Sequence, residues 1–227
     1  SFVQDKSVGR LIFRWVNALY LGLLGFSCLL PMLNLLAISF SSSGAVSSGS
    51  VGLWPVDFTL KSYEYMANKP EFLEALWVSI QRLLLGVSLN LAVTVLAAYP
   101  LSKSNRVFRG RRFYVWFMVV TMLFSGGLIP WYMVVRATGL IDTVWALVLP
   151  GAVPVFSVIL MMNFFKTIPA GIEEAATMDG CGHVRMLLSI YLPLSAPSIA
   201  TVALFAIVNH WNSWFDGMVF MNRPEHY

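Results

Sequence analysis

The sequence predicts an all-α protein, a polytopic bundle of membrane-spanning helices with five spans. Of the 227 residues, 58% are apolar and only 11% are Asp, Glu, Lys or Arg, whereas a soluble domain normally spends about a quarter of its residues on these charges. Five intervals without charge are long enough for one helix to cross a bilayer, which takes about 20 residues. These intervals are 15–56, 83–102, 113–135, 143–165 and 186–215. The composition argues against a water-soluble enzyme.

The first two expected spans are separated by a long loop. Span one covers about residues 11–38 and is too long for the apolar core of a signal peptide, which has about 7 to 15 residues. The Ser/Gly-rich stretch after it has too little apolar surface to offset dehydration of its hydroxyls and backbone. Span two covers about 72–101, with Arg82 in its outer third. We expect Arg82 to extend to the lipid headgroups; the alternative is that it faces a cavity or a partner.

Helix-breaking residues interrupt the next two spans. Span three, about 113–129, ends in the Gly-Gly-Leu-Ile-Pro stretch at 126–130, so we expect residues 131–140 to form a short outer connector. Span four, about 143–165, contains Pro150 and Pro154. We expect these prolines to kink the helix where neighbouring helices can satisfy the freed carbonyls.

Span five, about 198–219, differs from the others in its outer half. Asn209, either Asn212 or Ser213, and Asp216 recur there at helical spacing, which predicts one polar face. Trp211 and Trp214 accompany that face. Amides that bind hydroxyls beside aromatic rings suit a sugar pathway. Hydrogen bonds between helices, with an interfacial belt of tryptophans, explain the same residues equally well.

The positive charges predict the orientation of the spans, because short loops rich in Lys and Arg stay in the cytoplasm. With a cytoplasmic N-terminus, that side holds Lys6, Arg10, Arg14, Lys103, Arg106, Arg109, Arg111, Arg112, Lys166 and Arg185. The outer side holds Lys61, Lys69, Arg136 and Arg223. The predicted topology is therefore N-inside. Cations spread over short loops also argue against a nucleic-acid partner.

The loop at 166–193, between spans four and five, predicts two short helices in the cytoplasm. Pro169 suits a first helical turn, and Gly180 suits a left-handed helix end. The second helix should run over about 182–191 and stop before Pro193. Alanines at the exposed tip of a membrane protein suit the docking of a partner.

This loop carries a motif that resembles a known family. It consists of Glu174-Ala175-Ala176, three residues, Gly180, nine residues, Ile190, one residue and Leu192-Pro193. The motif matches the EAA loop of the permeases of binding-protein-dependent ABC importers. Nearly the whole chain resembles the MalG-like carbohydrate subgroup of these permeases and its LplC-type oligosaccharide relatives, through 52–60, 98–102, 126–132, 139–143 and 211–215.

The resemblance implies the type I permease fold and a coupling helix seated on an ATPase. The residues expected at that contact are Glu174, Ala175, Ala176, Met178, Gly180 and Val184. Residues 11–227 would form the transmembrane domain, with its core at about 72–227, after a cytoplasmic segment at 1–10. The family has six spans, so we expect that this chain lacks the last span and the C-terminal tail.

The resemblance further implies a transport subunit of the bacterial plasma (inner) membrane. It would translocate a sugar or oligosaccharide by alternating access, together with a second permease subunit, two cytoplasmic ATPases and an external solute-binding protein. The chain has no Gly-Lys dipeptide and hence no P-loop, so ATP and Mg²⁺ would be bound by the ATPases and no cofactor by the chain itself.

Two sets of residues are candidates for contacts outside the coupling loop. The candidates for the substrate path are Asn209, Trp211, Asn212 and Trp214, with Arg82 for an acidic sugar. The candidates for docking of the binding protein are Trp54, Phe58, Tyr132 and Asp142, although aromatic residues such as the first two also suit an interfacial belt.

Three other functions remain as alternatives. One is an ABC permease for a cargo other than sugar. A secondary transporter needs intramembrane carboxylates, but spans one to four have none in their interiors. An intramembrane metalloenzyme is disfavoured because the sequence has no HExxH helix and no metal-ligand spacing among its histidines. We expect neither a catalytic nor a metal site.

Overall fold

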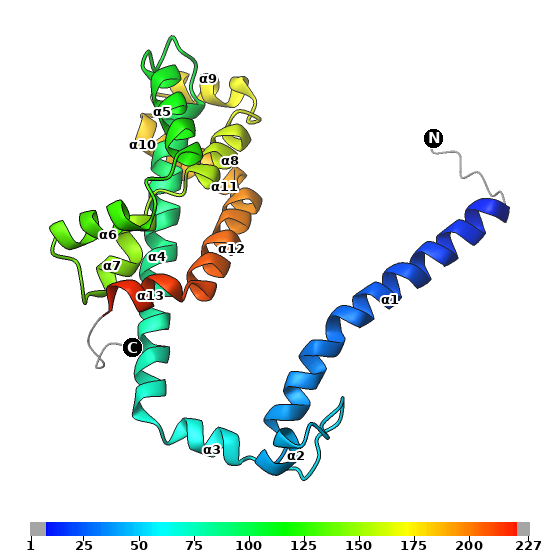
Figure 1. The fold of residues 1–227 in the computed structure, drawn as a ribbon. Coiled ribbons are helices and arrows are strands. Elements are labelled where there is room, and N and C mark those ends of the chain that lie inside the picture. The colour runs from blue at the N-terminus through cyan, green and yellow to red at the C-terminus, as the bar shows by residue number, and fades with distance from the viewer. Residues whose placement is uncertain (1–7, 222–227) are drawn as a thin grey trace. The chain divides into compact units, whose positions relative to one another are not determined.

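The structure is a computed structural model that describes residues 8–221. The described residues form helices joined by turns and loops, with no strand among them (Figure 1). The chain divides into two compact units, residues 1–72 and 73–227. We describe each unit separately.

The first unit contains a long helix and a folded loop. Helix α1 spans Val8–Ser39, and its apolar part agrees with the predicted first span. The short helices α2, Ser43–Ser47, and α3, Lys61–Ala67, follow it. Phe40 stacks on Phe58 with ring centroids 5.5 Å apart. The Ser/Gly-rich stretch thus folds as a loop with a short helix and not as a second span, as its low apolar content indicated.

The second unit is built around α4, Pro70–Ser102, which begins in the first unit. Helices α5, Arg111–Leu123, and α6, Leu128–Ala137, follow and are bent by 116° at the break between them. Gly127 lies in this break with φ of 84°, a conformation that favours glycine. The predicted break is therefore confirmed, and most of the expected connector is helical.

Span four is kinked as predicted. Helix α7, Val144–Val148, and the short turn η1, Leu149–Gly151, are bent by 48° relative to α8, Val155–Phe165. The side-chain amide of Asn90 on α4 donates to the carbonyls of Gly151 and Ala152, at 2.8 and 3.1 Å. A neighbouring helix thus satisfies carbonyls at the break, as bilayer burial requires.

The segment after α8 folds into several short helices. They are α9, Ala170–Met178; α10, His183–Met186; the π-helical turn η2, Leu187–Tyr191; and α11, Leu192–Leu194. The predicted stop before Pro193 is wrong. Pro193 is tolerated because it lies in the first turn of α11, where its missing N–H is not needed. The preceding turn η2 is π-helical, with hydrogen bonds from i to i+5.

Span five is also broken, which the sequence did not indicate. Helix α12 covers Ala196–Asn212 and α13 covers Phe215–Phe220, with Ser213 in an extended conformation between them. The predicted polar face is therefore wrong as a continuous helical face, because Asp216 belongs to a different helix from Asn209.

Two apolar clusters hold the second unit together. The larger one is formed by buried residues of α4, α8, η2 and α12, including Ala98, Met161, Phe165 and Val202. The smaller one is formed by Val135, Ala146 and Phe220. Within the described residues, two single helices and three bent pairs are long and apolar enough to cross a membrane, which agrees in number with the five predicted spans.

Candidate functional site

The two-helix loop around α9 presents one exposed face and one packed face. Glu174 and Ala175 are exposed, and the apolar side chains of Met178 and Val184 are 89% and 73% exposed. Ala176, in contrast, packs against the larger apolar cluster. Exposed apolar side chains beside a polar rim are typical of a docking surface. The structure thus brings the predicted coupling residues together at one end of the second unit.

Gly180 ends α9 as predicted. Its φ is 75°, in the left-handed region that favours glycine. The backbone N–H of Gly180 donates to Thr177 O at 3.0 Å, and that of Cys181 donates to Ala176 O at 2.9 Å. Gly180 therefore sets the direction in which the chain leaves α9 toward α10.

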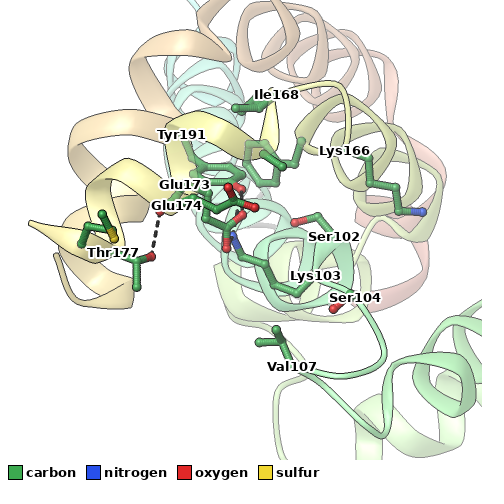
Figure 2. Close-up of a pocket in the computed structure, with 13 residues that line it drawn as sticks. Ser102, Lys103, Ser104, Val107, Lys166, Ile168, Glu173, Glu174, Thr177 and Tyr191 are labelled. Atoms are coloured by element: carbon green, nitrogen blue, oxygen red, sulfur yellow. Dashed lines mark hydrogen bonds and ion pairs between the residues drawn. The ribbon is translucent and has the colours of Figure 1, made fainter. Parts of the chain in front are cut away.

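A buried lysine joins α9 to the end of α4. Lys103 Nζ lies 2.8 Å from Glu173 Oε1 and donates to the Tyr191 hydroxyl at 2.8 Å. The Tyr191 hydroxyl in turn donates to Glu173 Oε2 at 2.7 Å. The ammonium also lies over the rings of Tyr99 and Tyr191, 4.3 and 4.2 Å from their centroids. Figure 2 shows Lys103, Glu173 and Tyr191 gathered beside the cavity that they line.

The surroundings of this lysine keep Glu173 ionised. Burial acts to raise the pKa of Glu173, but the hydrogen bonds from Lys103 and Tyr191 and the lysine charge outweigh it, so the pKa lies below its ordinary value. The cavity has a volume of about 650 Å³ and is also lined by Lys166 and Glu174. Burial, followed by the charge of Arg111, lowers the pKa of Lys166.

A second buried ion pair lies near the other end of the bundle. Arg82 on α4 donates from Nη1 and Nη2 to the two carboxylate oxygens of Asp216 on α13, and from Nη1 to Ser213 O at 2.8 Å. Arg82 is only 6% exposed. The prediction that it extends to the headgroups is therefore wrong, because α13 supplies a carboxylate within the protein.

A histidine and an asparagine extend this polar group. His210 Nε2 lies 3.0 Å from Asn90 Oδ1, and both side chains are buried. A Cβ on Gly86 would come within 2.5 Å of the His210 ring, so the absence of a side chain at Gly86 leaves room for this ring. Asn90 thus joins α4 to the break in span four and to α12, while Arg82 joins α4 to α13.

Two cavities flank the buried arginine. One, of about 470 Å³, is lined by Ser79, Arg82, Trp211 and Trp214 among others. The second, of about 320 Å³, is lined by Arg82 and Asn209 among others. Four of the five predicted path residues therefore line a cavity.

The fifth predicted path residue, Asn212, is exposed and lines neither of these cavities. Asn212 is the last residue of α12, and Ser213, at the break that follows it, lines both cavities instead.

The predicted docking residues lie in different units. Trp54 and Phe58, in the first unit, are 82% and 67% exposed. In the second unit, Tyr132 stacks on Phe220 with centroids 6.2 Å apart, and the backbone N–H of Asp142 donates to Phe220 O at 3.0 Å.

Several residues that organise these sites were not predicted. Lys103 was assigned only to a cytoplasmic loop, although it is the first cation after span two. Asn90 is an amide in an otherwise apolar stretch, and such a residue is costly in a bilayer unless it is paired. The side chains that pair with Lys103 lie 70 and 88 residues further along the chain, so sequence spacing does not reveal them.

Helices long and apolar enough to span a membrane, a two-helix loop with exposed apolar side chains at one end and cavities beside a buried arginine nearer the other are features of one class of protein, the membrane transport subunit. The family described as "Binding-protein-dependent transport system inner membrane component" matches residues 8–215. The chain belongs to this family.

Similar proteins agree with this assignment. Protein LplC of Bacillus subtilis strain 168 is 41% identical over 220 residues, which are 97% of this chain and 74% of LplC. The polygalacturonan/rhamnogalacturonan transport system permease protein YtcP of the same organism is 38% identical over 195 residues, covering 86% of this chain and 68% of YtcP. A solved bacterial ABC transporter involved in the import of the acidic polysaccharide alginate has a similar chain, with a TM-score of 0.90 and 35% identity. That match covers 97% of this chain and 78% of the other.

These findings confirm the predicted fold class and the permease function. The chain is a transmembrane subunit of an ABC importer in the inner membrane, a transport component rather than an enzyme. Its transporter includes ATPase and binding-protein partners.

Proposed function

We propose that this permease translocates a sugar or oligosaccharide through a path that includes the cavities beside Arg82. The observation that carries this proposal is the position of two tryptophans, Trp211 and Trp214, which line the 470 Å³ cavity together with Ser79 and Arg82. Aromatic faces next to a few polar groups suit a sugar, which has apolar ring faces and many hydroxyls. The transport system names of similar proteins support a carbohydrate cargo.

An acidic sugar is the more specific candidate. Arg82 lines both cavities, and its buried Nε has no hydrogen-bond partner within the described residues. Arginine binds carboxylates through paired N–H groups, and Asp216 already uses Nη1 and Nη2 in this way. An acidic cargo would therefore compete with Asp216 for the guanidinium. The similar alginate transporter supports this cargo class.

On the opposite side, the exposed face of α9 and the start of α10 would bind the ATPase. Glu174 and Ala175 would lie at the contact with Gly180, Met178 and Val184 would fill apolar pockets, and Ala176 would hold α9 against the rest of the second unit. A pair of ATPases would bind ATP and Mg²⁺, and a second permease subunit would complete the path. An external binding protein would dock on the outer loops, through residues such as Trp54, Phe58, Tyr132 and Asp142. Alternating access follows if these partners bind two states with different affinities.

Trp211→Ala is expected to weaken binding of the sugar in the path and so to raise the KM for uptake. The loss of one aromatic contact, worth about 0.5–1.5 kcal/mol beyond burial, should raise the KM for uptake about 2- to 12-fold. A ligand screen on the cognate binding protein identifies the sugar, and uptake into proteoliposomes measures the effect. Trp77→Ala is the matched control, because Trp77 is an exposed tryptophan of α4 that lines neither of the two cavities beside Arg82. Equal uptake by the two variants would remove Trp211 from the path.

The N-terminus is expected in the cytoplasm, and labelling of single cysteines tests this. With Cys28 and Cys181 replaced by serine, Ser48→Cys should react with a membrane-impermeant maleimide in intact cells. Ser104→Cys should react only after permeabilisation. Both positions are exposed in the structure, so a difference reports the side of the membrane. The reverse pattern would contradict the N-inside topology.

A further inference from the structure

Helix α4 and the residue directly after it carry one buried cation, with its carboxylate partner, in each half of the second unit. Arg82 pairs with Asp216 of α13, and Lys103, directly after the last residue of α4, pairs with Glu173 of α9. The two cations are 21 residues apart in the chain, or about 32 Å along a helix. Figure 1 shows α9 at one end of this unit, whereas α13 crosses α4 nearer to the other end. One continuous helix therefore links the loop around α9 to the wall of the two cavities beside Arg82.

The pair at Lys103 differs from an ordinary cytoplasmic charge pair. A lysine that only marks the membrane boundary would be solvated, and exposed pairs contribute little to stability. The Lys103 side chain is 5% exposed, and its ammonium contacts a carboxylate, a hydroxyl and two aromatic faces. The Glu173 side chain is 32% exposed, so the unpaired charge that costs most is that of Lys103, whose buried ammonium would lose its counter-charge without Glu173.

The remaining packing of α9 is apolar. Ala176 of α9 and its neighbours Ile168 and Cys181 pack against the larger cluster. Apolar contact is not directional, so on its own it allows α9 to slide. Hydrogen bonds have strict distance and angle requirements. The bonds of Glu173 to Lys103 and Tyr191 therefore fix where α9 lies relative to the end of α4 and to η2.

We propose that Lys103 is a positioning residue. It transmits displacement of α9 to α4, and through α4 to the two cavities that flank Arg82. This rests on the proposed function of α9 as the ATPase contact. When the ATPases close, α9 moves, and the Lys103–Glu173 pair makes α4 move with it rather than slide past. Tyr191 holds the pair from the side of span five, so both spans respond together.

The rate at which a reagent labels the 470 Å³ cavity tests this linkage, and the measurement does not require the cargo to be known. Ser79 lies on α4, is exposed and lines the 470 Å³ cavity. In the assembled transporter with Cys28 and Cys181 replaced by serine, the maleimide labelling rate of Ser79→Cys is measured without nucleotide and after trapping with ATP and vanadate. With Lys103 intact, we expect trapping to change the rate about fivefold or more. With Lys103→Met, the change should fall below about twofold while ATP hydrolysis persists.

Conservative variants separate transmission from folding. Lys103→Arg keeps the charge and should retain most of the labelling change. If apolar packing alone linked α9 to α4, the charge at this position would make no difference between Lys103→Met and Lys103→Arg. If Lys103→Met does not assemble, Glu173→Gln provides the same comparison, because it leaves Lys103 its two aromatic rings. A full labelling change in either assembled variant overturns the proposal. No change with Lys103 intact would instead contradict alternating access, and the linkage with it.

Discussion

Asp216→Asn is expected to destabilise the permease strongly. The amide keeps the shape of the side chain, and with its oxygen in the place of Oδ1 it still accepts from Ser213 and Gly217. Its NH2 group would face Arg82 Nη2, so the substitution removes the charge and the acceptor that Nη2 uses. Arg82 would then lie buried without a counter-charge, which costs about 3–5 kcal/mol. For a chain of this size the melting temperature should fall by about 6–20 °C. Thermal unfolding of the purified transporter measures the loss.

The double variant Arg82→Gln/Asp216→Asn is the control for that loss. It removes both charges, and a neutral pair costs far less to bury than one unpaired ion. We expect it to melt closer to the unsubstituted protein than Asp216→Asn does. If the single and double variants melt at the same temperature, the ion pair does not hold α13 against α4.

Local sequence properties predicted most of the elements of this fold. Apolar length located the spans, and Pro150, Pro154 and Gly127 marked breaks that the structure contains, because these residues act on their own backbone. Gly180 was predicted to end α9 for the same reason. Each of these features depends on a residue and its immediate neighbours, so a single sequence is sufficient to find it.

The break in span five and both buried ion pairs depend on contacts between distant segments. No proline or glycine precedes Ser213 in that half of the span. Asp216 instead accepts from the Ser213 hydroxyl at 2.8 Å and from the Gly217 N–H at 3.1 Å while it pairs with Arg82. These bonds stabilise a new helix start 134 residues after its arginine partner. Charge counting placed Arg82 correctly along the span, but it gave no information on the partner.

The shape of the loop around α9 was predicted more completely than the cavities for a related reason. The loop is local in the chain, and its glycine, proline and small residues describe its shape. The cavity walls combine α4, the broken span four and the end of span five, including Arg82, Leu147 and Trp211. The resemblance to a known family indicated the loop contacts, whereas the wall residues came only from side-chain chemistry, and Asn212 was consequently misplaced.

Gly180→Val is expected to abolish most coupled transport while membrane insertion stays intact. At φ of 75° a β-branched residue is strained, at a cost of about 1–3 kcal/mol. That cost corresponds to about a 5- to 150-fold lower population of the native turn. The proposed ATPase contact includes residues on both sides of this turn, Met178 and Val184, so their relative position would be lost. ATPase activity and uptake of the purified transporter measure the effect.

The loop contains a matched control two residues away. Gly182 has φ of −72° and ψ of 163°, an extended conformation that valine adopts readily, and a Cβ at either glycine would meet no atom within 4 Å. Gly182→Val adds the same side chain to the same loop without backbone strain, so it should retain activity. Gly180→Asn should also retain more activity than Gly180→Val, because asparagine tolerates the left-handed region. If all three variants lose activity equally, bulk at the docking surface is responsible, and the left-handed turn is not. If Gly180→Val transports and hydrolyses ATP normally, the proposed coupling role of this turn is wrong.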